Sequence, residues 1–289
     1  GDFDVEEAKA WVHKYFDEIP RGQEVNNMAP QAGVVSEIAK LYHEDNFARL
    51  PELTYTWPTV EQYHPDSYAL DVLAQYLTNG KKAPFNQVLV EEKKLTSGPR
   101  MFNRTSELAG QFQLSVRAYA DKDLDDVASA INEAFAKFEA EGISEKDLGR
   151  IKAGQETGFY NSLSSVLGKG FQLAQYNIFA NDPGFIKKDI ESILAVTTAD
   201  VKRVYEKYIK GKNYIATSFV PRGQLELALA GSEKAEVVEE AIVQGAEETF
   251  DASIQADYER TPSSFDRTVE PPYGKAPEVQ IPAVYESSL

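Results

Sequence analysis

The sequence predicts an α+β fold, in which helices pack on one face of a largely antiparallel sheet. Strand-like alternation occurs in two pairs of segments, and three amphipathic helical segments follow before a last strand-like segment. The resulting order is β-β-α-α-β-β-α-α-α-β. Of the 289 residues, 42% are hydrophobic and 26% are charged, which is typical of a globular chain with a sizeable core.

The chain has no cysteine and carries a formal net charge of −16. The lack of cysteine excludes disulfides, thiolate nucleophiles and cysteine-based metal sites. The negative charge disfavours nucleic acid and anionic membranes as partners. Because no run of about 18 apolar residues occurs, we expect no membrane insertion. The chain begins at Gly1 with neither Met nor an apolar leader, so we expect a cut or processed polypeptide.

The first segment predicts an amphipathic helix. Asp4 and Glu7 have the spacing of a capping box, and an apolar stripe at helical spacing follows. Residues 20–22 end the helix, and the polar stretch up to about residue 36 predicts a linker. The stripe needs a partner, so we expect this helix to belong to whatever precedes the chain. The residues of the apolar stripe are Ala8, Trp11, Val12, Tyr15 and Phe16.

The next segments predict the first pair of strands and the first buried helix. Alternating, β-favouring residues predict strands over about 37–47 and 52–60. Pro65 suits the first turn of a helix, and Asn79 with Gly80 ends it.

A shorter helix and the second pair of strands come next. The helix is expected over about 84–94, and the strands over about 100–106 and 110–120. In the second of these strands, Phe112 and Leu114 alternate with polar residues. Such a strand has one buried face and one solvated face.

The following region predicts a run of helices. An amphipathic pattern covers residues 124–138. Ser144 and Asp147 have capping-box spacing and open a second helix, which is expected to continue to about residue 180 with a break near residues 168–170. Thr197 repeats the capping pattern and opens a third helix.

The domain organisation follows from this order and from the tail. Gly211 ends the third helix, and residues 214–220 predict a last strand. We expect residues 1–29 to end a preceding domain, residues 30–221 to form one domain, and residues 222–289 to form an acidic, proline-rich linker. That tail carries 5 basic and 14 acidic residues, and a solvated helix is expected over about 233–248. Its prolines favour extended chain.

No catalytic or metal-binding motif stands out. The three histidines, His13, His43 and His64, lack the spacing of a zinc motif, so we expect structural or exposed roles for them. No phosphate-binding glycine loop and no nucleophile elbow occurs. Adjacent carboxylates do not face each other on a helix, so solvated faces are expected. These pairs are Glu6/Glu7, Glu91/Glu92, Asp125/Asp126, Glu239/Glu240 and Glu247/Glu248.

Several segments together resemble the insulinase/pitrilysin family of zinc metallopeptidases. GDFD at 1–4 and YFDEIPRG at 15–22 resemble the end of that family's first domain. HPDSYALDVL at 64–73 and FNQVLVEEKKL at 85–95 resemble the first long helix of its second domain and the segment after it. Residues 266–278 resemble the linker between the two modules of long bacterial members. The similarity covers nearly the whole chain in the right order.

The resemblance implies the second, non-catalytic domain of a first module, followed by the inter-module linker. In this family a module pairs two similar α/β domains, and two modules close around a peptide-holding chamber. Zinc binds H-x-x-E-H and a distant Glu on the first domain, and this motif is absent from the 289 residues. Substrate-contacting Arg and Tyr residues of the second domain align with Val90 and Ser97, which cannot replace them. No catalytic, cofactor-binding or metal-binding residue is therefore carried over.

Three functional hypotheses follow. The first is a structural, substrate-enclosing domain of a zinc-dependent peptidase, with this chain inactive alone and zinc in the preceding domain of the parent. Its partners would be that domain, a second module and peptide substrates. The alternative is a pseudo-peptidase that serves as a structural or partner-binding protein. The third is an unrelated enzyme with a carboxylate site. The compartment stays open, with export to the bacterial cell envelope or periplasm suggested by extended relatives.

Overall fold

The computed structural model describes residues 2–23, 28–120, 122–237, 269 and 274. The chain divides into two units, one that contains helix α1 and one that contains every other described helix and strand. Each unit is described by itself.

Helix α1 (Val5–Phe16) presents its apolar stripe to solvent. The predicted cap forms, because the Asp4 side chain accepts a hydrogen bond from the backbone N–H of Glu7 at 2.8 Å. No residue of α1 is buried, and Trp11 is 56% exposed. The helix therefore offers an exposed apolar surface within the described part of the chain.

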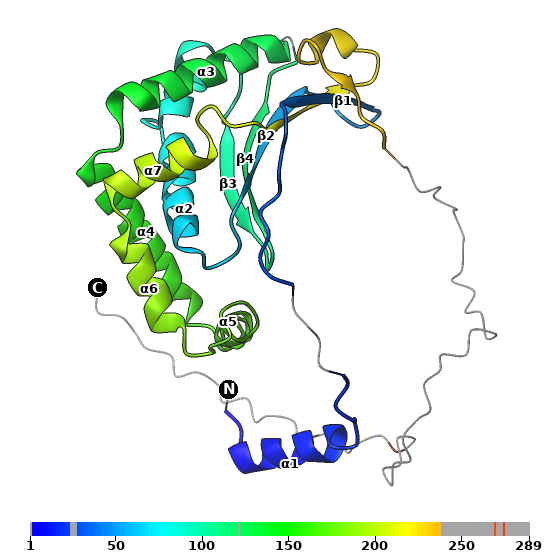
Figure 1. Ribbon diagram of the computed structural model, residues 1–289, viewed down its shortest axis with the longest axis vertical. Coiled ribbons are helices and arrows are strands. Elements are labelled where there is room, and N and C mark those ends of the chain that lie inside the picture. The colour runs from blue at the N-terminus through cyan, green and yellow to red at the C-terminus, as the bar shows by residue number, and fades with distance from the viewer. Residues whose placement is uncertain (1, 24–27, 121, 238–268, 270–273, 275–289) are drawn as a thin grey trace, which may run out of the picture. The chain divides into compact units, whose positions relative to one another are not determined.

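The second unit is built on a six-stranded sheet of order β3-β4-β2-β5-β1-β6 (Figure 1). The first four strands in this order pair antiparallel, whereas β1 pairs parallel with both β5 and β6. The predicted, largely antiparallel sheet is confirmed. The strands are β1 (Ala39–Asp45), β2 (Glu52–Thr59), β3 (Arg100–Thr105), β4 (Gly110–Arg117), β5 (Ile215–Pro221) and β6 (Glu233–Lys234).

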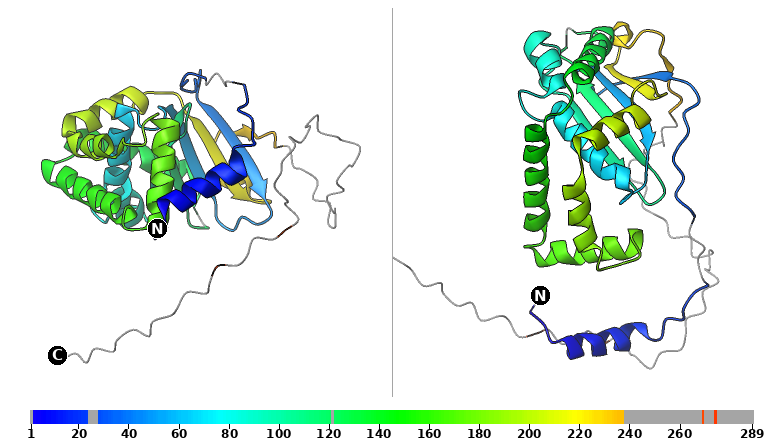
Figure 2. Two further views of the ribbon diagram at one scale, coloured as in Figure 1. Left: turned by 90° about the horizontal axis from the view of Figure 1, so that it is seen from below. Right: turned by 60° about the vertical axis from the view of Figure 1, so that its left-hand side comes forward.

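All helices of this unit lie on one side of the sheet (Figures 1 and 2). Helices α2 (Pro65–Thr78), α3 (Leu124–Glu141) and α7 (Thr198–Tyr208) contact the sheet or each other directly. Along β2, Leu53, Tyr55 and Trp57 are buried toward this layer, and the residues between them are half-buried. The alternation that predicted half-buried strands is therefore observed.

A charged cluster around buried Asp66 fixes α2 against α7. Asp66, in the first turn of α2, receives hydrogen bonds from Arg203 at 2.6 Å, Lys207 at 2.8 Å and Tyr208 at 2.6 Å. Burial opposes ionisation, but these donors outweigh it and hold the pKa of Asp66 well below its usual range. His64 precedes Pro65 and caps the helix through Nδ1, which accepts from the Asp66 backbone.

Helices α4 (Glu145–Ser162), α5 (Val166–Phe179) and α6 (Ile186–Ala195) form a part we call the arm. α4 and α6 run side by side, and α5 crosses near their ends (Figures 1 and 2). Ser144 caps α4 as predicted. Few arm residues are buried, and they are Leu148, Ile151, Tyr176 and Asp189.

Two sequence predictions about the arm need correction. The helix break lies at residues 163–165 and not near 168–170, because Ser165 caps α5 by accepting from the Gly168 N–H. Gly168 is in the helix, and a Cβ there would collide with the Ser162 carbonyl oxygen, so this glycine permits a close approach. Helix α6 was not predicted. The shorter helix expected over about 84–94 is confirmed as η1 (Asn86–Glu92), which is a π-helix.

The chain continues to pack on the sheet beyond residue 221. A short 3₁₀-helix, η2 (Leu225–Leu227), leads to buried Leu229, whose N–H donates to Ser218. Residues 233 and 234, expected in a solvated helix, instead form strand β6. Almost all of the predicted linker after residue 237, including Glu239/Glu240 and Glu247/Glu248, lies outside the described residues. In the described chain, no helix combines the length and the apolar character needed to cross a bilayer.

Candidate functional site

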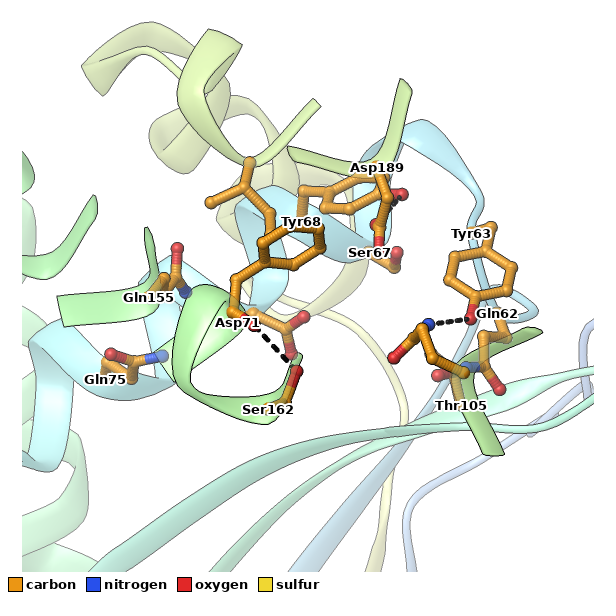
Figure 3. Close-up of a pocket in the computed structure, with 13 residues that line it drawn as sticks. Gln62, Tyr63, Ser67, Tyr68, Asp71, Gln75, Thr105, Gln155, Ser162 and Asp189 are labelled. Carbon is orange, nitrogen blue, oxygen red and sulfur yellow. Dashed lines mark hydrogen bonds between the residues drawn. The ribbon is translucent and has the colours of Figure 1, made fainter. Parts of the chain in front are cut away.

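A polar cavity of about 410 Å³ lies where α2 meets the arm. Figure 3 shows Tyr68 and Asp71 of α2, Ser162 of α4 and Asp189 of α6 around one space. Among the described residues that line it there are two carboxylates but no lysine or arginine. The walls therefore present mainly hydrogen-bond acceptors, amides and aromatic rings.

Asp189 is the centre of a buried hydrogen-bond network. Its two carboxylate oxygens accept from the hydroxyls of Tyr68 at 2.8 Å and Tyr176 at 2.7 Å. Burial, followed by the charge and hydrogen bond of Asp189, raises the pKa of Tyr68. Burial and the same carboxylate also raise the pKa of Tyr176, so both hydroxyls act as donors at neutral pH. The network joins α2, α5 and α6.

Tyr63 lines the cavity and has an uncommon backbone conformation. Its φ is 63°, in the left-handed region that non-glycine residues rarely adopt. The ring then packs on Tyr176 and Phe185, with centroids 5.6 Å and 5.1 Å away. Its hydroxyl accepts a long hydrogen bond from Gln172 at 3.5 Å, drawn in Figure 3.

Asp71 is the second carboxylate of the cavity. Its Oδ1 accepts from the Asn103 amide of β3 at 3.3 Å. Burial, reinforced by the negative charge of Asp189, raises the pKa of Asp71 to about 7, although the Asn103 hydrogen bond opposes the shift. This group therefore changes its protonation near neutral pH. The cavity can accept hydrogen bonds from donor groups such as amides, hydroxyls or amines.

The histidines singled out in the sequence lie on three separate elements. His13 is exposed on α1 and pairs with Asp17 at 3.0 Å, and His43 stacks on Phe219 of the neighbouring strand. His64 caps α2. In the ranges that the structure describes, no group of three or more His, Cys, Asp or Glu residues is arranged to hold a metal ion.

The two positions aligned with the family's substrate-contacting pair lie close together in the sequence but differ in setting. Val90 is half-buried within η1, and Ser97 is exposed in a bend before β3. Neither lines the polar cavity.

Sequence reasoning missed Asp189 because it missed α6. A usable signal exists, since Asp189 lies three residues after Ile186 and four before Ile193. That spacing puts a carboxylate on the apolar face of a helix, where it must be buried and hydrogen-bonded. Asp71 lies in the segment that carried the family resemblance. Only the tertiary fold, however, places it in the same cavity as Asp189.

These observations define a two-layer α+β domain with one helical layer and, in the described chain, no metal-binding cluster. Residues 1–155 match the family described as the peptidase M16 inactive domain, and the chain belongs to this family. The resemblance to zinc peptidases of the insulinase type, in their second domain, is thereby confirmed.

Solved structures share the fold at low sequence identity. A protease from Helicobacter pylori is 20% identical with a TM-score of 0.65, and the alignment covers 76% of this chain and 53% of that one. A peptidase M16 inactive domain from Pseudomonas fluorescens is 16% identical with a TM-score of 0.61, over 82% and 54% of the two chains. A chain of complex III2 from Candida albicans is 15% identical with a TM-score of 0.60, over 76% and 53%.

This chain therefore spans about half the length of these solved chains. Comparison with curated proteins gave no match.

Proposed function

We propose that this chain is the non-catalytic half of a zinc-dependent peptidase, and that it forms part of the wall that encloses peptide substrates. The observation that carries the proposal is the match to an inactive peptidase domain in a chain about half as long as its solved relatives. Zinc and the residues that activate water would then belong to the preceding domain of the parent protein.

The exposed stripe of α1 supports this arrangement. A helix with no buried residue gains little from folding alone, because most helix stability comes from packing an apolar face. Trp11 and Phe16 are large apolar side chains that a neighbouring domain would cover. We infer that α1 completes that domain and holds the two halves together.

The test uses the complete parent protein, expressed from its full coding region. We expect bound zinc by elemental analysis, cleavage of fluorogenic peptides, and loss of cleavage when the metal is chelated. The present chain, purified alone, should not cleave the same peptides. A parent protein that binds no zinc and cleaves no peptide would overturn the proposal.

A variant pair tests the role of α1 separately. Trp11→Ala in the parent protein should lower the midpoint of thermal unfolding, because it removes a large side chain from the proposed interface. Glu6→Gln, on the opposite face of the same helix, is the matched control and should have little effect. Equal midpoints for both variants would contradict the proposed docking of α1.

A second candidate function is a structural subunit without peptidase activity. It is favoured by the similarity of fold to a chain of complex III2 from Candida albicans. In that case the parent protein would carry no zinc and would co-purify in a stable assembly of defined stoichiometry. Elemental analysis together with mass measurement of the native assembly separates the two functions.

A further inference from the structure

The outer half of the arm, residues 153–189, has few contacts that hold it to the rest of the domain. It contains the end of α4, all of α5 and the start of α6. Among its residues, all of which the structure describes, only Tyr176 and Asp189 are buried. Leu148 and Ile151, by contrast, anchor the beginning of α4 in the core. Because few buried contacts hold it, the outer half is the part of the arm that separates most easily.

Helix α4 is weakened at the point where the outer half begins. Gly154 and Gly158 lie within the helix, and a Cβ at either position would meet no atom within 4 Å. Packing therefore does not require these glycines, and each lowers the helix equilibrium constant by about fivefold relative to alanine. A bend here would let the outer half move. The inner half would stay in place, because Lys152 Nζ donates to the Val196 carbonyl at 2.8 Å.

A small polar and aromatic contact closes the outer half of the arm on α2. The Tyr68 hydroxyl of α2 donates to Asp189 of α6 at 2.8 Å, and the ring of Tyr63 packs on that of Tyr176. The polar cavity lies at this contact, with Asp71 on the α2 side and Asp189 on the arm side (Figure 3). The closing contact is therefore made by one carboxylate and faced by another.

Asp71 faces a charge of its own sign across the cavity. Asp189 is the only other carboxylate among the described residues that line the cavity, and no lysine, arginine or histidine lines it. The titratable hydroxyls near Asp189 are those of Tyr63, Tyr68 and Tyr176, and burial raises the pKa of each, so they stay neutral. From α4, α5 and β3 the cavity receives only uncharged polar groups, Gln155, Ser162, Gln172 and Thr105.

We propose that Asp71 and Asp189 form a pH-sensitive latch for the arm. When Asp71 is neutral, the outer half of the arm stays closed on α2. When Asp71 is ionised, two like charges share a cavity that holds no cationic side chain, and the outer half swings away so that water reaches Asp71. The latch is a property of this chain alone and does not depend on the proposed peptidase function.

The direction of the response follows from the burial of Asp71. Burial and the charge of Asp189 raise the pKa of Asp71 to about 7 in the closed domain. Opening hydrates the carboxyl and moves Asp189 away, so the pKa falls toward its ordinary value. The ionised form therefore favours the open arm. The opening equilibrium rises with pH, by at most about tenfold per unit and only up to about pH 7.

The experiment measures the distance between two dyes by single-molecule energy transfer in the full 289-residue chain. Because the sequence has no cysteine, Ser129→Cys on α3 and Leu167→Cys on α5 can be labelled selectively. Both positions are exposed, one on the fixed part and one on the outer half of the arm. We expect the open population to increase at least about fivefold from pH 5 to pH 8, while circular dichroism shows that the domain stays folded.

Variants connect this change to the two carboxylates. Asp71→Asn removes the ionisation, so the open population should agree at the two pH values within about twofold. Glu191→Gln changes an exposed carboxylate of α6 outside the cavity, and this matched control should keep the full response. Tyr68→Phe removes the hydroxyl that donates to Asp189, and should raise the open population at pH 5 by about tenfold. Gly154→Ala should lower it by about fivefold at both pH values.

Each result supports or overturns the latch. Loss of the pH response in Asp71→Asn and its retention in Glu191→Gln support it. A distance that does not change with pH overturns it, and so does an equal pH response in Asp71→Asn and the wild type. Unfolding of the whole domain at pH 8 overturns it as well. If Asp71→Asn does not fold, Tyr68→Phe decides, because an unchanged open population at pH 5 would mean that the contact does not hold the arm.

Discussion

The sheet with its covering helices and the arm are stabilised in different ways. Against the sheet, α2 buries a continuous apolar surface that includes Leu70, Val72, Leu73 and Leu77. Along the arm, most residues are exposed, and Tyr176 and Asp189 are held by hydrogen bonds. The comparison teaches that one part depends on apolar burial throughout, whereas the other is attached by a few buried apolar residues, Leu148 and Ile151, together with a polar network.

The largest expected loss of stability comes from a substitution in the core between the sheet and α2. Leu70→Ala, at a residue with no exposed surface, should lower the free energy of unfolding by about 2–5 kcal/mol through lost burial and a cavity. Leu167→Ala on α5, where the side chain is 70% exposed, should change it by less than about 0.5 kcal/mol. Urea denaturation measures both. Similar losses would remove the distinction between the two regions.

The next effect is at the charged cluster that joins α2 to α7. Asp66→Ala should cost about 2–3 kcal/mol, because three donors lose a shared carboxylate. The folded chain holds the pKa of Asp66 below its unfolded value. The stabilisation is therefore present above the unfolded pKa and is lost as pH falls through the acid range. Unfolding measured at neutral and acidic pH should show the wild type and the variant converging at low pH.

A smaller effect is expected where the arm is attached. Tyr176→Phe removes the hydroxyl that donates to Asp189, and should cost about 1–2 kcal/mol. The substitution leaves the ring and its packing on Tyr63 in place. Hydrogen exchange should become faster in α5 and α6 while protection of the sheet strands is unchanged. Uniform acceleration across the sheet would mean that the arm and the core unfold as one unit.

The last effect depends on pH and has the opposite sign, because the substitution stabilises the chain. Burial raises the pKa of Asp71 from its ordinary value of 3.8 to about 7, so the folded chain loses stability as pH rises between these values. Asp71→Asn removes that loss. The variant should match the wild type near pH 4 and be more stable at pH 8, by up to about 4 kcal/mol, since each pKa unit corresponds to about 1.4 kcal/mol. Thermal unfolding at the two pH values tests the sign of this stability difference. If Asp71→Asn were more stable than the wild type only at low pH, the prediction would be contradicted.

Much of the fold could be predicted because its signals are local. Ser144 and Thr197 cap the helices they were expected to open, and Pro65 begins α2. These side chains act on backbone groups within three residues, so the sequence alone contains the interaction. The α6 helix escaped prediction because its start carries no local signal: Phe185 precedes it and makes no side-chain capping hydrogen bond.

The candidate site was much harder to predict. Asp71 and Asp189 are more than a hundred positions apart, and only the packing of the arm brings them to one cavity. Local patterns cannot reveal such encounters between distant segments, although a carboxylate on an apolar helix face does indicate burial.

Strand β6 has a mechanical consequence. It pairs with β1 at only two positions, Leu41 with Glu233 and Tyr42 with Lys234, and one further hydrogen bond links Ala235 to Tyr42. Tension applied to the chain beyond this point would act first on these few bonds, whereas the other strands share longer registers. Strand β6 would therefore detach under low force, whereas buried Leu229 and its hydrogen bond to Ser218 would still hold the preceding chain to the sheet.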